Sequence, residues 1–263
     1  MNKGLLFEWC IYYLIRRADP GKAKRDPIFR QAQTHYKTAP AEVKKAAVKA
    51  IQVTEKQYGD ITDVKKISGG DEPKTDLIIV AGRTKLKCSL KFGKSVQLSS
   101  GGVKNTVQFL TGVLENVKHR EGYNKKQITQ IISTLAKFEK EYGDIGKLPR
   151  NQIDEHFAKA ERYDALLKNI LGSRREPKVS EEYAKLKLAI VEEAMTGKYT
   201  FGNNDKTANH ILNDRECKKI DKKFVKKIAD ETSVRLALKG RGKEVIAGEV
   251  VRLNEIVVRF DTG

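Results

Sequence analysis

Cysteine and long apolar runs are both scarce in this chain. Its 263 residues include three cysteines, Cys10, Cys88 and Cys217, which lack the close spacing of zinc ligands. An odd number of scattered thiols is typical of reduced cysteines in a cytoplasm. No segment approaches 18 consecutive apolar residues, the length that a membrane-spanning helix needs. The sequence therefore predicts a cytoplasmic protein without a disulfide framework, a zinc motif or a membrane span.

Signatures of several enzyme classes are also absent. The sequence contains no P-loop, no nucleotide-binding glycine fingerprint and no Gly-x-Ser-x-Gly elbow. The apolar run near the start mimics a signal peptide, but Glu8 interrupts it and no small-residue cleavage site follows, so we expect no export. The four histidines are isolated, and each is expected to be a surface or structural residue: His35, His119, His156 and His210.

Positive charge is abundant instead. Lysine and arginine total 52 against 34 acidic residues, which gives a net charge of +18. Such an excess indicates a polyanionic partner, either nucleic acid or an anionic membrane surface. Basic clusters at 216–227 ("ECKKIDKKFVKK") and 239–243 ("KGRGK") would attract DNA non-specifically, although each can also be a plain solvated surface. We expect DNA, as a duplex, to be the partner, with no membrane association; a homodimer is left open.

Hydrophobic periodicity predicts a chain of mixed α/β or α+β class. Helices are expected at 4–17, 40–58, 105–117, 125–142, 152–171 and 181–196, the last ended by Gly197. Strands are expected at 60–68, 77–80, 86–92 and within 232–260, while 199–214 reads as a loop. The expected domains are a first part of the core at 1–104, a helical insertion at 105–178 and a completing segment at 179–263.

The stretch "TDLIIVAGRTKLKCSLKFG" predicts a hairpin with an acid and a lysine at one end. Asp76 opens a strand that is apolar throughout, as in a strand covered on both faces. Across the turn, the register of an antiparallel pair would place Asp76 beside the segment from Ser89 to Lys91. A carboxylate that holds Mg²⁺ and an ammonium that positions water suit phosphate-ester hydrolysis. A structural salt bridge would give the same pattern.

Two glutamates on apolar helical faces add further candidate acids. Glu8 is the one charged residue in "LLFEWCIYYLI", and Leu5, Tyr12 and Ile15 share its helical face. Glu193 likewise shares a face with apolar residues, namely Leu186 and Ile190, and with Gly197. A buried carboxylate needs a cation, a hydrogen-bond network or a metal. Either glutamate can therefore be a metal ligand or part of a structural network.

This arrangement resembles the PD-(D/E)XK, or restriction-endonuclease-like, nuclease superfamily. In that family a helical glutamate precedes a β-hairpin with an aspartate and then an acid-x-lysine motif. The resemblance covers 1–104 and implies a mixed sheet flanked by helices. By position, it makes Glu8 the helical acid, Asp76 the metal-bridging aspartate and Lys91 the motif lysine.

The sequence departs from the family pattern at two places. The proline is at 73 rather than next to Asp76, and Ser89 stands where a carboxylate is usual. "SLKFGKSVQLSSGG" is similar to family variants in which serine precedes x-lysine and a glycine- and serine-rich loop approaches DNA. With that acid missing, the carbonyl of Leu90 is expected to coordinate the metal, and Glu193 is a candidate substitute ligand.

The expected function is therefore a DNA endonuclease that uses Mg²⁺, with Mn²⁺ as an alternative, and that nicks or cuts both strands. The expected DNA contacts are polar residues in and after the hairpin: Lys87, Lys94, Gln97, Ser99 and Ser100. Two other functions stay open. One is a DNA-binding protein whose nuclease site is inactive because Ser89 replaces an acid. The other is a basic scaffold or packaging protein in which the acids only form salt bridges.

Overall fold

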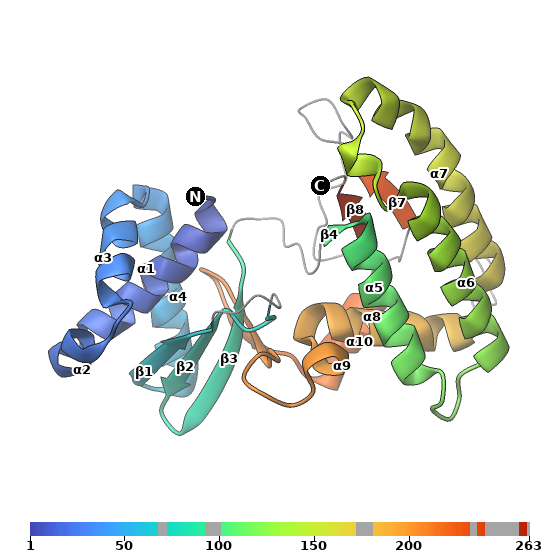
Figure 1. Ribbon diagram of the computed structural model, residues 1–263. Helices are drawn as coiled ribbons and strands as arrows, with labels where there is room; N and C mark the ends of the chain where they lie inside the picture. The colour runs from blue at the N-terminus through green and yellow to red at the C-terminus, as the bar shows by residue number, and fades with distance from the viewer. Residues whose placement is uncertain (68–72, 93–100, 172–180, 232–235, 240–257, 262–263) are drawn as a thin grey trace. The chain divides into compact units, whose positions relative to one another are not determined.

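The structure, a computed structural model, describes residues 1–67, 73–92, 101–171, 181–231, 236–239 and 258–261 (Figure 1). The chain divides into two compact units. The first unit comprises 1–96 and 195–224, and the second comprises 97–194 and 225–263. Both units combine helices and strands, so the expectation of a mixed α/β chain is confirmed.

The first unit contains a mixed sheet of five strands in the order β1-β2-β3-β5-β6. The strands are β1 (Ile61–Lys66), β2 (Leu77–Ala81), β3 (Thr84–Leu90), β5 (His210–Leu212) and β6 (Cys217–Lys219). Neighbouring strands are antiparallel except for β3 and β5, which run parallel. The parallel pair joins a hairpin from the start of the chain to a segment that follows the long helical block.

The hairpin of β2 and β3 forms where the sequence predicts it. Four of the five residues of β2 are buried, as expected for a central apolar strand with cover on both faces. The turn depends on Gly82, whose φ is 55°. A Cβ atom there would lie 2.5 Å from the carbonyl oxygen of Tyr58, so only glycine fits this close approach.

Four helices precede or flank the strands of the first unit: α1 (Lys3–Arg17), α2 (Pro20–Arg25), α3 (Phe29–Thr38) and α4 (Ala41–Tyr58). Helices α1 and α4 pack against the sheet, and the expected helices at 4–17 and 40–58 are confirmed. The core between these layers includes Phe7 and Ile11 from α1 and Ala47 from α4. Leu77 and Leu86 of the sheet complete it, and all five side chains are fully buried.

The segment 199–214, expected to be a loop, contains regular structure. Part of helix α9 (Lys198–Phe201) and the whole of strand β5 lie in it. Each is only three or four residues long, so neither contains enough residues to show a periodicity in the sequence. Gly197, by contrast, ends the preceding helix as predicted, with a left-handed φ of 69°.

The second unit is mainly helical. Its elements are β4 (Gly101–Gly102), α5 (Val103–Val117), α6 (Lys125–Tyr142), the 3₁₀ turn η1 (Ile145–Lys147), α7 (Arg150–Leu171), β7 (Leu236–Lys239) and β8 (Val258–Asp261). Helices α8 (Glu181–Thr196) and α10 (Lys222–Glu231) belong mostly to this unit and cross its two boundaries. The expected helices between 105 and 196 are all present. No helix in the described part of the chain is long and apolar enough to cross a bilayer.

The two units divide the chain differently from the expected domains. The late strands β7 and β8 form a separate sheet with β4 in the second unit. Only 195–224, rather than all of 179–263, joins the sheet that carries the hairpin. The expected division into 1–104, 105–178 and 179–263 followed the composition of the linkers, which does not reveal long-range strand pairing.

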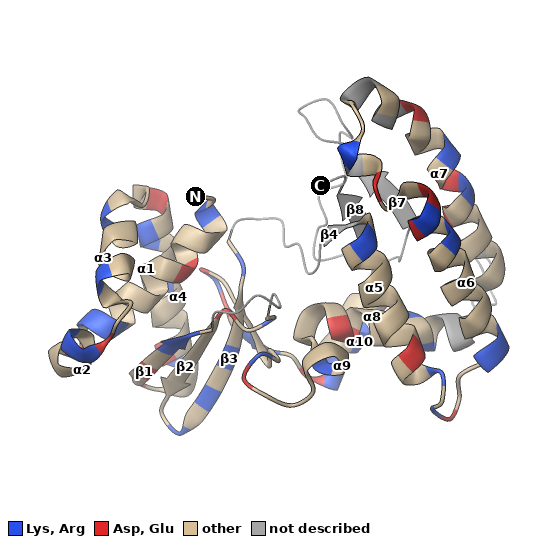
Figure 2. Cartoon of the chain, viewed as in Figure 1, with Lys and Arg blue, Asp and Glu red and all other residues tan. Residues whose placement is uncertain are grey.

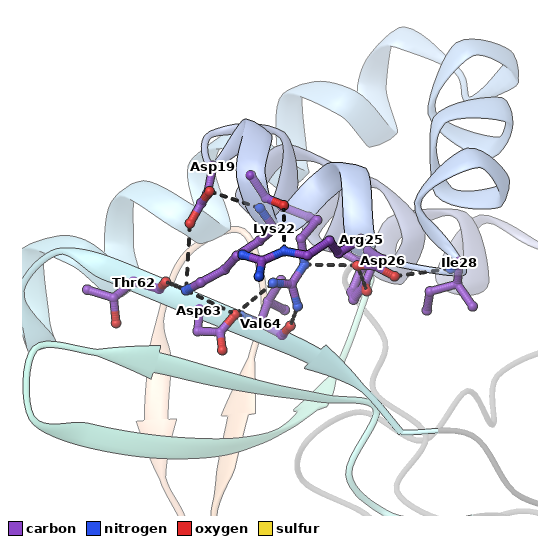
Figure 3. Close-up of polar contacts among 11 residues, drawn as sticks. Asp19, Lys22, Arg25, Asp26, Ile28, Thr62, Asp63 and Val64 are labelled. Carbon is purple, nitrogen blue, oxygen red and sulfur yellow. Dashed lines mark hydrogen bonds and ion pairs between the residues drawn. The ribbon is translucent and has the colours of Figure 1, made fainter.

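A partly buried polar network ties α1 to β1 and to the turn after α2. The guanidinium of Arg16 forms ion pairs with Asp26, at 2.9 Å from Nε to Oδ2, and with Asp63, at 2.8 Å from Nη1 to Oδ1. It also donates a hydrogen bond to the carbonyl oxygen of Val64, and Tyr12 donates one to Asp26. Figure 3 shows Asp26, Asp63 and Val64 among the polar contacts of this region. Arg16 thus neutralises two carboxylates that meet at the joint between helix and sheet.

Replacing Arg16 with methionine should destabilise the first unit by about 3–5 kcal/mol, because Asp26 would keep a buried, unpaired charge. The side chain of Asp26 is only 8% exposed. Lys22→Met is the matched control, since Lys22 is 37% exposed and its ion pairs should contribute about 0–1 kcal/mol. Urea unfolding followed by the fluorescence of Trp9, the single tryptophan, measures this unit. Equal losses of unfolding free energy in Arg16→Met and Lys22→Met would contradict the role of Arg16 as the cation that neutralises Asp26.

Candidate active site

The structure places Asp76 beside the end of β3, as the expected register requires. Its backbone N–H donates a hydrogen bond to the carbonyl oxygen of Cys88 at 2.9 Å. Its carboxylate accepts a hydrogen bond from the backbone N–H of Leu90, with 2.6 Å from Oδ2 to N. Both the backbone and the side chain of Asp76 are therefore fixed against the second strand of the hairpin.

Segments distant in sequence hold both sides of this site. The carbonyl oxygen of Lys206 accepts hydrogen bonds from the N–H groups of Lys74 and Thr75, which directly precede Asp76. On the other strand, the N–H of Lys91 donates a hydrogen bond to the carbonyl oxygen of Leu212 in β5, at 2.9 Å. The segment 195–224 therefore positions both Asp76 and Lys91, although its sequence gave no sign of this role.

Glu8, Asp76 and Lys91 form one electrostatic cluster. Burial and, after it, the negative charge of Glu8 raise the pKa of Asp76 to about 6 against the opposing effect of Lys91. Burial lowers the pKa of Lys91, while the charges of Asp76 and Glu8 act in the opposite direction. The three residues predicted from the sequence to act together are therefore close enough to influence one another.

The cation that Glu8 requires is present as Lys66, at the end of β1. The Nζ atom of Lys66 lies 2.6 Å from Oε2 of Glu8, and the two side chains are 10% and 17% exposed. The same Nζ lies 4.9 Å from the centre of the Trp9 ring, a cation–π geometry. Leu5, which was expected to share the inward face of Glu8, is 37% exposed and lies at the edge of that face.

Lys66 is the residue of the site that the sequence reasoning missed. Side chains alternate between the two faces of a strand, so Lys66 shares the face of Val64, which is 1% exposed. The signal in the sequence was a lysine two positions after an apolar residue of the same strand. That spacing directs the lysine toward the interior, where it requires a nearby carboxylate.

The other residues predicted for the site are not part of the Glu8–Asp76–Lys91 cluster as the structure describes it. Glu193 in α8 is 1% exposed, which confirms its expected burial, and it belongs to the second unit, whereas Asp76 belongs to the first. Lys87 lies on β3 and donates a hydrogen bond from Nζ to the carbonyl oxygen of Asn204 at 2.8 Å. Four predicted DNA contacts lie outside the described residues: Lys94, Gln97, Ser99 and Ser100.

The buried His210 has a structural environment. Its Nε2 lies 3.0 Å from the Tyr58 hydroxyl, and its Nδ1 lies 2.6 Å from Oδ1 of Asn209. Burial lowers its pKa to about 4, so the ring is neutral at pH 7. These contacts link β5 to the end of α4 and agree with the structural role expected for the histidines.

The donor set of the site fits a magnesium ion that is shared with a substrate. In the described ranges, no group of three or more His, Cys, Asp and Glu side chains is arranged to hold a metal ion by itself. Mg²⁺, however, is usually held by one or two carboxylates together with substrate phosphates and waters. Burial and, after it, the charge of Glu8 raise the pKa of Asp76, and a divalent cation would relieve the repulsion between these two carboxylates. The carbonyl of Leu90 would complete this set.

Comparison with known proteins gives no relative for this chain. No family model matches the sequence, no curated protein matches it and no solved structure matches its fold. The interpretation of the site therefore rests on its own residues.

The raised pKa of Asp76 predicts an unusual dependence of stability on pH. The pKa is about 6 in the folded chain and near 3.8 ordinarily, so the folded state binds more protons between these values. The contribution of Asp76 to the free energy of unfolding therefore falls as pH rises from about 4 to about 6. Asp76→Asn removes this contribution. The free energy of unfolding of the variant, relative to that of wild type, should therefore rise by about 2–3 kcal/mol between pH 4 and pH 6.

Urea unfolding of both proteins in EDTA at several pH values, followed by Trp9 fluorescence, tests this expectation. A stability difference that stays constant from pH 4 to pH 7 would show that Asp76 titrates normally.

Proposed function

We propose that this chain hydrolyses phosphodiester bonds in DNA with the help of Mg²⁺, as a divergent member of the PD-(D/E)XK, restriction-endonuclease-like superfamily. The observation that carries the proposal is the partly buried cluster of Glu8, Asp76 and Lys91. A helical acid, the aspartate of a hairpin and a lysine on its second strand interact in the arrangement that the resemblance implies. The five-stranded mixed sheet with helices α1 and α4 against it supports the same assignment.

Each side chain of the cluster would have a distinct task. Asp76, fixed by the N–H of Leu90, and Glu8 would hold the metal ion, which when bound supplies a Lewis acid for the phosphate and lowers the pKa of a bound water. Lys91 would orient the attacking water and stabilise the negative charge that develops on the phosphate. Because burial lowers the pKa of Lys91, its ammonium group loses a proton more readily than an exposed lysine does.

The distribution of charge supports binding of a polyanion by the unit that carries the site. The first unit has 27 lysines and arginines against 14 acids, whereas the second has 25 against 20. Most of the net charge of +18 therefore belongs to the first unit. Figure 2 shows basic residues along α2, α3 and β3 of this unit. An excess of this size attracts DNA through its phosphates and brings the backbone toward the site.

A second candidate function is DNA binding without hydrolysis. Two observations favour it: Ser89 replaces the usual acid, and Lys66 already neutralises Glu8 at 2.6 Å. If that ion pair persists in the complex with DNA, Asp76 would be the one remaining carboxylate for a metal. Both functions predict affinity for DNA, but only the first predicts cleavage that depends on a metal.

Incubation of supercoiled plasmid with the protein and either Mg²⁺ or EDTA should show nicking or linearisation only with Mg²⁺. Asp76→Asn and Lys91→Met should each reduce the rate at least a hundredfold, because each removes stabilisation of the transition state. Lys85→Met is the matched control, an exposed lysine on the same strand, and should cut at nearly the wild-type rate.

All three variants should keep most of their DNA affinity in EDTA. Cleavage at the wild-type rate by both site variants would place the reaction elsewhere. A wild-type protein that binds DNA but never cuts it would support the second function instead.

Glu8→Gln tests whether the helical acid is a metal ligand. Glutamine keeps the shape and removes the charge, so we expect at least a tenfold loss of cleavage together with a higher Mg²⁺ requirement. Ser89→Ala is the control within the site and should remain active, since the residues next to Ser89 in the sequence include no histidine or aspartate that would activate its hydroxyl as a nucleophile. A covalent adduct between DNA and Ser89, or full activity of Glu8→Gln, would contradict the metal-dependent mechanism.

A further inference from the structure

Three aromatic rings form a stack on the helical side of the first unit. Tyr13 of α1 lies between Phe29 and Tyr36 of α3. The ring centres of Tyr13 and Phe29 are 5.4 Å apart with an interplanar angle of 23°, and those of Tyr13 and Tyr36 are 4.6 Å apart at 31°. All three side chains are partly exposed, and Tyr13 and Tyr36 also pack against the hydrophobic core of the unit.

Two cations lie over these rings. The guanidinium carbon of Arg17 is 5.5 Å from the ring centre of Tyr13 and 5.8 Å from that of Tyr36. The Nζ atom of Lys44 is 5.2 Å from the ring centre of Tyr36. We call these five residues the aromatic–cationic surface. Cation–π contacts hold both charged groups in defined positions without neutralising them.

The positive charge of this surface is not matched by neighbouring acids. Within the residues that the structure describes, no carboxylate lies at ion-pairing distance from Arg17 or Lys44. The acid nearest to Lys44 in the sequence, Glu42, is paired with Lys3 at 2.5 Å. The Nζ of Lys44 instead donates a hydrogen bond to the carbonyl oxygen of Lys37. Arg17 and Lys44 are therefore available to an anionic partner.

We propose that the aromatic–cationic surface binds a single-stranded segment of nucleic acid. Aromatic rings beside basic groups are typical of sites where unpaired bases stack while lysine and arginine contact the phosphates. A duplex offers its phosphates to such a surface but keeps its base faces stacked inside, so it can use the cations and not the rings. This second site differs in residues from the Glu8–Asp76–Lys91 cluster and needs no metal.

Binding of a labelled single-stranded oligonucleotide and of the matching duplex, measured by fluorescence anisotropy in EDTA, tests the proposal. Tyr36→Leu should weaken single-strand binding about tenfold and leave duplex binding nearly unchanged, because stacking of one base contributes about 1–3 kcal/mol. Tyr36→Phe keeps the ring and should keep the affinity. Arg17→Gln should weaken single-strand binding and reduce the magnitude of its logarithmic salt slope by about 1.

Lys49→Gln, which removes an exposed lysine elsewhere on α4, is the control for charge and should bind the single strand within about twofold of wild type. Thermal unfolding followed by Trp9 fluorescence confirms that each variant is folded. Wild-type single-strand affinity in folded Tyr36→Leu and Arg17→Gln would overturn the proposal. So would an equal loss of single-strand and duplex binding in Tyr36→Leu, or variants that lose binding to anionic lipid vesicles while they keep their affinity for the single strand. Because every measurement is made in EDTA, failure of the proposed cleavage leaves this test intact.

Discussion

The hydrogen bonds between Asp76 and β3 are the constraint on which the candidate site depends. The backbone of Asp76 is bonded to Cys88, and its carboxylate is bonded to the N–H of Leu90. These bonds hold the carboxylate beside Glu8, where burial and the charge of Glu8 raise its pKa to about 6, although the hydrogen bond from Leu90 acts in the opposite direction. A group held in this state either binds a proton or gains stability from a cation, which is why the same geometry suits a metal-dependent reaction.

The charge balance of the site bears on both proposed functions, hydrolysis of DNA and binding without hydrolysis. Two acids, Glu8 and Asp76, face two lysines, Lys66 and Lys91, so the metal-free cluster is electrically balanced. A divalent ion and the phosphodiester group that accompanies it would add charges of opposite sign. Lys66 would compete with the metal ion for Glu8, because it already forms an ion pair with that carboxylate. Under the proposed function, whether hydrolysis or simple binding occurs would depend on which cation Glu8 prefers when DNA is present.

Local patterns in the sequence predicted much of this structure. The apolar helix around Glu8, the hairpin and the register that brings Asp76 to Leu90 all follow from periodicity and turn chemistry. The strands β5 and β6 could not be predicted, since three residues are too short to show alternation and their pairing depends on contacts distant in sequence. Lys66 was missed for a related reason: its partner lies on α1, 58 residues earlier in the chain.

The central claim is that Asp76 and Glu8 hold one divalent cation together with the DNA backbone. Titration of Mn²⁺ into the protein bound to a duplex with non-hydrolysable phosphorothioate linkages, followed by electron paramagnetic resonance, measures this directly. The account predicts one bound Mn²⁺ per chain, with a broadened signal that Mg²⁺ displaces, and loss of that signal in Asp76→Asn. The same bound signal in wild type and Asp76→Asn, or no bound Mn²⁺ in either, would contradict it.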